Sequence, residues 1–197
     1  MEPADDLLTT LVHAGVGGDR LTEAEFVKLF VLLLSAGNLS IGASYANTQI
    51  SLLRNPGQRD LVLDDMRLVP RAVEEALRMN PVVSCSARTA TLDVELRGRQ
   101  IAQGDRLLLW YLSGNRDDTV FRSPDEFDMT RKELDHHLAF GVGGPQTCVG
   151  AWLARLELNT LVEETLRRFP RMRLITDPVR VPSLFVNRPA SVPVSLR

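Results

Sequence analysis

One stretch decides the fold of this chain: HHLAFGVGGPQTCVGAWLARLEL, from His136 to Leu158. It places one cysteine, Cys148, two residues before Gly150, where a helical pattern begins. The first amide hydrogens of a helix have no partner inside it, and the positive end of the helix dipole lies with them. We expect these amides to point towards the Cys148 sulfur and to favour its negatively charged thiolate.

Glycines surround that cysteine. Gly141, Gly143 and Gly144 can turn the backbone with positive φ and let a flat ligand approach closely. A lone cysteine is usually a small buried apolar residue. A thiolate on a tight loop ahead of a helix is instead how a protein presents a ligand to iron, and the surroundings of Cys148 favour this second interpretation.

The composition is that of a soluble globular protein. The 197 residues are 44% hydrophobic and 24% charged, with a formal net charge of −2, which suits one domain or part of a larger one. Basic and acidic residues are mixed along the chain, so we expect no binding of nucleic acid.

The cysteines and the apolar runs bear on location. Cys85 and Cys148 are far apart and lack the spacing of metal ligands, and without a secretory signal a reducing, cytoplasmic location is expected. The longest apolar run, from Phe26 to Gly37, contains Lys28 and is too short to span a bilayer. It predicts a buried helix and no membrane span.

The order of elements predicts the fold class. Thr22 and Glu25 form a capping box, which predicts a helix over about 23–54 that ends before Pro56. The remaining elements are a helix over about 66–79, a β-hairpin over about 88–112, a long loop over about 115–150, a helix over about 151–168 and an extended tail to 197. We therefore predict a mainly α protein of the α+β class, with long helices and a small sheet.

The cysteine stretch resembles the haem-binding loop of the cytochrome P-450 haem-thiolate family, F-G-x-G-x-H/R-x-C-x-G. Gln146 stands where a histidine or arginine usually contacts a haem propionate. The resemblance implies haem b as cofactor, with Cys148 as the ligand of its iron, and a single partial domain of this family over 1–197. The matching positions, in a loop one residue longer, are Phe140, Gly141, Gly144, Cys148 and Gly150.

A second constellation is Glu75 and Arg78, which are three apart on a predicted helix and can pair. Surface pairs of this spacing are common by chance. Upstream of the cysteine loop, however, the pair resembles the family's Glu-x-x-Arg, a buried pair that holds the loop, and Arg131 could extend it. Arg88 sits where family members have an arginine that reaches a propionate, a bidentate contact; a strand-edge charge is the alternative.

The third constellation lies in the long helix, between Ser35 and Gly42. It resembles the family pattern A-G-x-D/E-T, in which small residues leave room above the iron and an acid–alcohol pair relays protons. Ala36 and Gly37 match, or serve only close helix packing, and Ser40 supplies a hydroxyl. Leu39 stands at the acid position and cannot carry a proton, so oxygen would be activated poorly unless water or another group replaces it.

The resemblance implies a function for nearly the whole chain. It implies a monooxygenase that inserts one oxygen atom from O₂ into a small apolar molecule, with electrons from a ferredoxin- or flavodoxin-type partner. His137 is expected to be structural. The residues that could line the substrate pocket, or pack in the core, are Val82, Val83, Phe185 and Val186.

Family members have, in addition, an amino-terminal half. The chain is therefore expected to be the carboxy-terminal half of the fold, as a fragment, a natural truncation or one part of a split protein. Loss of the other half would expose apolar surface and favour self-association or partner binding. The alternative function is a degenerate haem-binding or interaction protein that keeps the scaffold without turnover.

Overall fold

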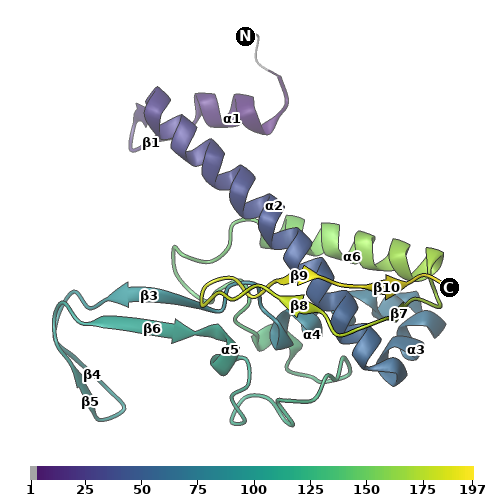
Figure 1. The fold of residues 1–197 in the computed structure, drawn as a ribbon. Coiled ribbons are helices and arrows are strands. Elements are labelled where there is room, and N and C mark those ends of the chain that lie inside the picture. The colour runs from purple at the N-terminus through teal and green to yellow at the C-terminus, as the bar shows by residue number, and fades with distance from the viewer. Residues whose placement is uncertain (1–3) are drawn as a thin grey trace. The chain divides into compact units, whose positions relative to one another are not determined.

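The computed structural model of the protein describes residues 4–197, which form two compact units that divide after Ser40. The long helix α2 (Glu23–Arg54) begins in the first unit and ends in the second (Figure 1). The other elements of the first unit are α1 (Leu7–His13), β1 (Gly15–Val16) and β2 (Asp19–Arg20), the two strands pairing antiparallel.

Helix α2 has the bounds that the sequence predicts. Thr22 N donates to the Glu25 carboxylate at 2.9 Å and Glu25 N donates to the Thr22 hydroxyl at 3.3 Å, so the capping box is formed. At the other end, Pro56 is the first residue of the next helix, because its fixed φ and missing N–H suit that position.

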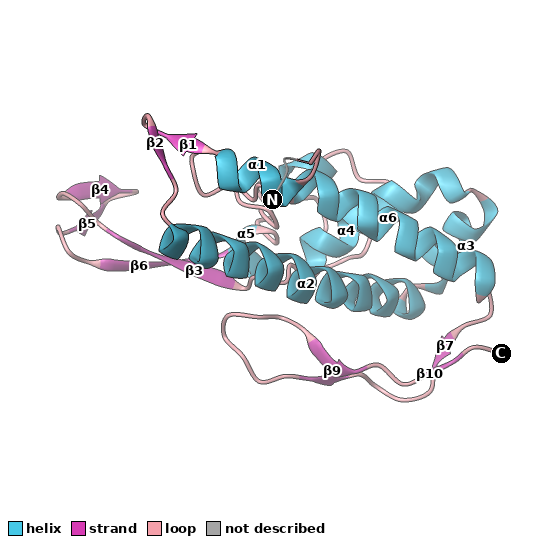
Figure 2. Cartoon of the chain, turned by 90° about the horizontal axis from the view of Figure 1, so that it is seen from above, coloured by secondary structure: helices cyan, strands magenta, loops and turns pink. Residues whose placement is uncertain are grey.

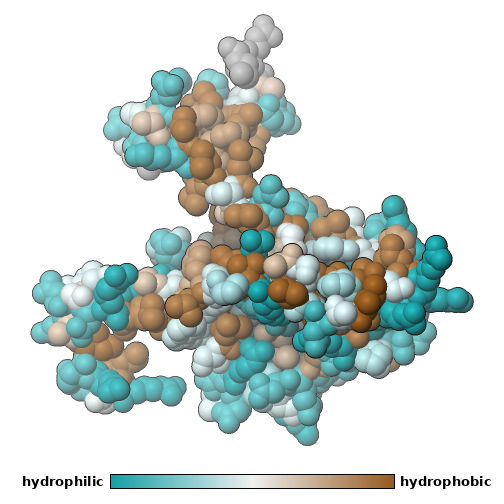
Figure 3. All heavy atoms as spheres, in the orientation of Figure 1, coloured by the Kyte–Doolittle hydropathy of each residue, from teal (hydrophilic) through white to brown (hydrophobic). Residues whose placement is uncertain are grey.

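The apolar first half of α2 is not buried, so the prediction of a buried helix is wrong there. Its exposed residues include Leu32, at 59%. Figure 3, in which brown marks apolar residues, shows them gathered on the first unit. The buried residues of α2 all lie between Ala43 and Leu52, in the second unit. The exposed large apolar residues of the first half are Val27, Val31, Leu32, Leu34 and Leu39.

By length and composition, α2 is also able to cross a membrane. It has 32 residues, and its most apolar window of 18 residues has a mean hydropathy of 1.7. The sequence prediction considered only the run from Phe26 to Gly37, whereas the helix continues well beyond it. Core helices of soluble proteins and signal sequences meet the same criteria, so this property alone does not indicate a membrane span.

Helices build the core of the second unit. The end of α2 is followed by α3 (Pro56–Asp64), the 3₁₀ turn η1 (Met66–Leu68) and α4 (Val69–Met79). Helix α4 lies beside α6 (Ala151–Arg168) (Figure 2). Helix α3 was not predicted from the sequence, whereas α6 has the bounds predicted. The core residues contributed by α4 and α6 are Val69, Ala72, Val73, Ala76, Leu77, Leu158, Val162 and Leu166.

The strands of residues 4–197 pair only in twos. Strand β3 (Cys85–Thr89) pairs antiparallel with β6 (Arg106–Trp110). Between them, β4 (Val94–Leu96) and β5 (Arg99–Ile101) form a hairpin. Its two turn residues, Arg97 and Gly98, both have positive φ, as a type I′ turn requires. The remaining elements are the one-turn helix α5 (Tyr111–Gly114), the 3₁₀ turn η2 (Leu134–His136), β7 (Arg173–Leu174) with β10 (Val194–Ser195), and β8 (Val179–Arg180) with β9 (Pro189–Ser191).

Candidate functional site

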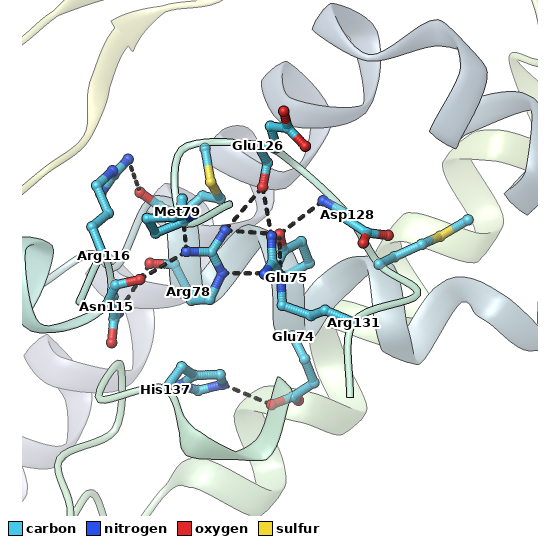
Figure 4. A network of polar contacts seen from close by, with 12 residues as sticks. Glu74, Glu75, Arg78, Met79, Asn115, Arg116, Glu126, Asp128, Arg131 and His137 are labelled. Atoms are coloured by element: carbon cyan, nitrogen blue, oxygen red, sulfur yellow. Dashed lines mark hydrogen bonds and ion pairs between the residues drawn. The ribbon is translucent and has the colours of Figure 1, made fainter. Parts of the chain in front are cut away.

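Glu75 is the centre of a buried network of charges on α4 (Figure 4). Its carboxylate accepts Arg78 Nε at 2.7 Å and Nη2 at 2.8 Å, the pair that the spacing predicts. It also accepts Arg131 Nε at 3.0 Å and Asp128 N at 2.9 Å. The side chains of Glu75 and Arg78 are fully buried. The cost of removing these charges from water is offset because both carboxylate oxygens are saturated with donors.

Two guanidinium groups share this carboxylate, and main-chain carbonyls supply their other partners. Arg78 Nη1 donates to Asn115 O at 2.7 Å and to Pro124 O at 2.8 Å. Arg131 Nη1 donates to Arg122 O at 2.6 Å. These carbonyls belong to the irregular segment between α5 and η2. The two arginines therefore fix the backbone conformation of this segment.

Asn115 connects this network to the cysteine loop. It is fully buried, and its Nδ2 donates to Arg78 O at 3.0 Å. Its Oδ1 accepts Leu138 N at 2.6 Å, so the beginning of the loop is bonded to the same asparagine that bonds α4. No spacing in the sequence pointed to this residue.

Glu74, next to Glu75 on α4, binds the two flanks of the loop. Ala139 N donates to His137 Nδ1 at 3.2 Å, and His137 Nε2 lies within hydrogen-bond distance of the Glu74 carboxylate, at 2.8 Å. From α6, Arg155 Nε and Nη2 donate to the same carboxylate at 2.7 Å and 3.0 Å. Burial raises the pKa of the Glu74 carboxyl, but the hydrogen bonds from His137 and Arg155 outweigh it and lower the pKa to about 2.

Sequence reasoning singled out neither Glu74 nor Arg155. Consecutive residues of a helix point about 100° apart, so the dipeptide Glu74–Glu75 reaches two different neighbours of α4. Arg155 follows Cys148 by about two helical turns. These signals are visible in the sequence but do not identify which partners they meet.

Within the loop, Cys148 lies at the carboxy-terminal end. Cys148 N donates to Phe140 O at 2.8 Å, and Gly141, with φ 74°, makes the turn that this closure needs. The Cys148 side chain is exposed. The predicted approach of helix amides to its sulfur is not observed: among the described residues no N–H donates to Sγ. Gly150 is the N-cap of α6 and has no capping side chain.

Beside the loop is an open pocket of about 320 Å³. It brings together three residues predicted for cofactor binding, Arg88, Gly141 and Gln146. The Arg88 guanidinium is exposed and donates to Ala87 O at 2.9 Å. The four other residues predicted for cofactor binding do not line this pocket: Phe140, Gly144, Cys148 and Gly150. The remaining lining residues are Leu109, Trp110, Tyr111, Leu138, Val142, Gly143 and Thr147.

The residues predicted for the oxygen side lie on α2, in the first unit. The Ser40 hydroxyl donates to Ala36 O at 2.6 Å, a bond inside the helix. A Cβ atom added to Gly37 would meet nothing within 4 Å. Leu39 is exposed. Close helix packing was the alternative role expected for Ala36 and Gly37, and within residues 4–197 it is not formed at Gly37.

The donor set at the loop fits haem better than a bare metal ion. The described residues contain no group of three or more histidine, cysteine or carboxylate side chains that could hold an ion. One exposed cysteine suits an iron that brings the four nitrogen donors of a porphyrin with it. A side chain at Gly141 would come within 3.5 Å of Gln146 O, in a backbone conformation that favours glycine.

The helical core, the Glu75–Arg78 pair and the cysteine loop are the features that resemble the cytochrome P-450 family in the sequence, and the structure contains all three. A model of the Cytochrome P450 family matches residues 54–189. The chain therefore belongs to the cytochrome P450 family, and the α+β class predicted from the sequence is confirmed.

Curated relatives and solved structures agree. The chain is 40% identical over 192 residues to the methyl-branched lipid omega-hydroxylase of Mycobacterium tuberculosis, covering 97% of this chain and 45% of that protein. It is 38% identical to Cytochrome P450-terp of a Pseudomonas species, covering 98% and 44%. A post-tailoring hydroxylase involved in himastatin biosynthesis superposes with a TM-score of 0.93 at 33% identity, covering 100% of this chain and 53% of that one. A Bacillus megaterium protein crystallised with testosterone gives 0.91 at 31% identity, covering 98% and 53%. The chain thus spans about half the length of these relatives.

Proposed function

We propose that this chain carries the haem-thiolate centre of a monooxygenase, with Cys148 as the ligand of the haem b iron. The position of Cys148 carries the proposal, because its exposed sulfur ends a glycine loop whose two flanks are bonded to α4. When bound, haem supplies the redox chemistry by which one atom of O₂ enters a substrate and the other becomes water.

The chain's own residues would hold and orient that group. Arg88 and Gln146 line one pocket beside the loop, where their N–H donors can serve the propionate carboxylates. The remaining contacts are proposed for the loop itself, through Phe140, Gly141, Gly144 and Gly150. Gly141 and Gly144 support this part of the proposal, because they adopt positive φ, which glycine tolerates, and have no side chain to keep a flat ligand from the backbone.

On the oxygen side, the proposal assigns a hydroxyl donor to Ser40, with Ala36 and Gly37 leaving space. The Ser40 proton is directed to Ala36 O in the structure, so it would have to exchange that partner to serve oxygen. Leu39 contributes no proton.

We further propose an apolar substrate and a separate electron donor. The relatives include a lipid hydroxylase and a steroid C26-monooxygenase. Val83 pairs with Val186, and Asn187 N donates to Val82 O at 2.7 Å, so the two segments predicted for the substrate pocket lie together. The proposed donor is a ferredoxin- or flavodoxin-type protein, in the cytoplasm. The half of the fold that this chain does not span would be supplied by a further polypeptide segment or replaced by self-association.

A second candidate function is haem binding without turnover. Two observations favour it: Leu39 at the acid position and the Ser40 hydroxyl bonded inside its own helix. In this case the cysteine loop and its anchoring network would bind haem, and oxygen would not be activated productively.

One experiment separates the two functions. The purified chain is reconstituted with haem, reduced and exposed to carbon monoxide, and product formation is then measured with a surrogate electron donor. A red-shifted thiolate Soret band with turnover supports the monooxygenase, and the same band without turnover supports the second candidate. Cys148→Ser should abolish that band while the matched control Cys85→Ser retains it; equal effects of both would refute Cys148 as the ligand.

A further inference from the structure

Glu74 occupies a junction of three segments that are distant in sequence. Its carboxylate lies on α4 and receives His137 from the amino-terminal flank of the cysteine loop and Arg155 from α6, which follows the loop. The His137 side chain is 2% exposed and the Glu74 side chain 19%. A pair this poorly accessible to solvent is not the mobile surface pair whose contribution is small.

The contacts continue from Glu74 to the cysteine. The Arg155 guanidinium carbon lies 4.5 Å from the centre of the Phe140 ring, a cation–π distance. The Phe140 carbonyl accepts Cys148 N at 2.8 Å. Three successive contacts, Glu74–Arg155, Arg155–Phe140 and Phe140–Cys148, therefore join α4 to the backbone of the cysteine.

We infer that Glu74 is a positioning residue for Cys148: it clamps both flanks of the loop and so fixes where the sulfur is presented. The role of this clamp in presenting the sulfur to haem rests on the proposed function. The clamp itself, the contacts of Glu74 with both flanks of the loop, is present in the chain without haem. The two adjacent carboxylates of α4 then have separate tasks. Glu75 holds the irregular segment that precedes η2, and Glu74 holds the loop that follows it.

Hydrogen exchange of the chain without haem tests the clamp. Glu74→Gln keeps the size of the side chain but removes the charge that makes its hydrogen bonds strong. We expect exchange in residues 138–150 to become about ten-fold faster or more, as the loss of a charge-assisted bond implies. Glu163→Gln is the matched control, because Glu163 pairs with Arg167 on the exposed side of α6 and touches no loop residue.

A second variant keeps the test decisive if Glu74→Gln fails to fold. Arg155→Met removes one arm of the clamp and leaves Glu74 and His137 in place, so loop exchange should accelerate by a similar factor. In the double variant the two effects should not add, because both act through one carboxylate. Unchanged loop exchange in Arg155→Met, equal acceleration in Glu163→Gln, or full additivity would each overturn the inference.

A spectroscopic measurement distinguishes positioning from simple loss of stability. In haem-loaded protein, Glu74→Gln should reduce the fraction of the carbon monoxide complex that shows the thiolate Soret band, at a temperature where its helical circular dichroism equals that of the wild type. Failure of the unmodified chain to bind haem would count against the proposed function but not against the clamp, which the exchange experiment decides alone.

Discussion

The two halves of α2 show that burial does not follow hydropathy along one helix. The first half carries the apolar run and exposes Leu32 and Leu34, whereas the second half buries polar residues. Two of those polar side chains have clear partners: Thr48 donates to Ser44 O at 2.8 Å, and Asn47 Nδ2 donates to Asn187 O at 2.9 Å. The buried side-chain amide of Gln49 is an exception, because neither its oxygen nor its nitrogen has a partner. A polar group can be buried when a partner is at hand, and an apolar residue stays exposed when no neighbour covers it.

The largest expected loss of stability follows substitution of Glu75, because an unpaired charge is most costly where the side chains are fully buried. Glu75→Gln leaves Arg78 and Arg131 without a counter-charge, so we expect it to destabilise the fold by about 4 kcal/mol. Glu163→Gln, in an exposed pair, should cost roughly 0.5 kcal/mol or less. Urea unfolding followed by circular dichroism measures both. Similar midpoints for the two variants would show that burial of the pair is unimportant.

The next largest loss of stability is expected for a buried leucine of α2, compared with an exposed leucine of the same helix. Leu52 is fully buried and Leu32 is 59% exposed. Leu52→Ala should destabilise by about 3 kcal/mol, because it leaves a cavity in a packed core. Leu32→Ala should change stability by about 0.5 kcal/mol or less. Equal losses in thermal unfolding would mean that the first half of α2 is covered in solution.

A pH measurement isolates the Glu74 carboxylate. Its pKa is about 2 in the fold and 4.5 ordinarily. Its contribution is therefore complete above pH 4.5 and is lost as the pH falls towards 2. We expect the wild type to lose roughly 1 kcal/mol more than Glu74→Gln between pH 6 and pH 3. This is less than the full shift implies, because pH 3 still lies above the pKa in the fold and because the exposed part of the side chain is screened. Parallel urea titrations of both proteins at pH 6 and pH 3 measure this difference; coincident losses would contradict it.

The smallest effect on stability concerns the exposed apolar residues of the first half. The double substitution Leu32→Ser, Leu34→Ser should change the unfolding free energy by about 0.5 kcal/mol. It should nevertheless reduce self-association, because an exposed apolar patch is what such contacts use. Sedimentation velocity over a range of concentrations measures the change. If wild type and variant sediment alike, this patch does not associate.

Local signals in the sequence predicted the ends of the two longest helices well, although they did not predict α3. Thr22, Glu25 and Pro56 set the limits of α2, and Gly150 marked the start of α6, because caps and breakers act within a few residues. The pairing of Glu75 with Arg78 followed from helical spacing for the same reason.

Apart from Arg131, which the family resemblance placed beside the Glu75–Arg78 pair, the sequence did not reveal contacts that join distant positions. Glu74 meets residues 63 and 81 positions away, and no local rule selects such partners. The prediction that the first half of α2 is buried was wrong because burial depends on which neighbours surround a helix. The prediction that helix amides point at the Cys148 sulfur was wrong because amides at a helix start need not face the preceding side chain.

Arg78 uses all five of its N–H donors, two on Glu75 and three on the carbonyls of Asn115, Pro124 and Glu126. The fixed size of its guanidinium group therefore constrains the positions of these three carbonyls, and with them the length of the backbone between Asn115 and Glu126. An insertion or deletion there would carry at least one carbonyl away from a guanidinium that cannot follow it. Length variation among relatives should consequently be rare in this interval and more common in the β4–β5 hairpin, whose tip has no such constraint.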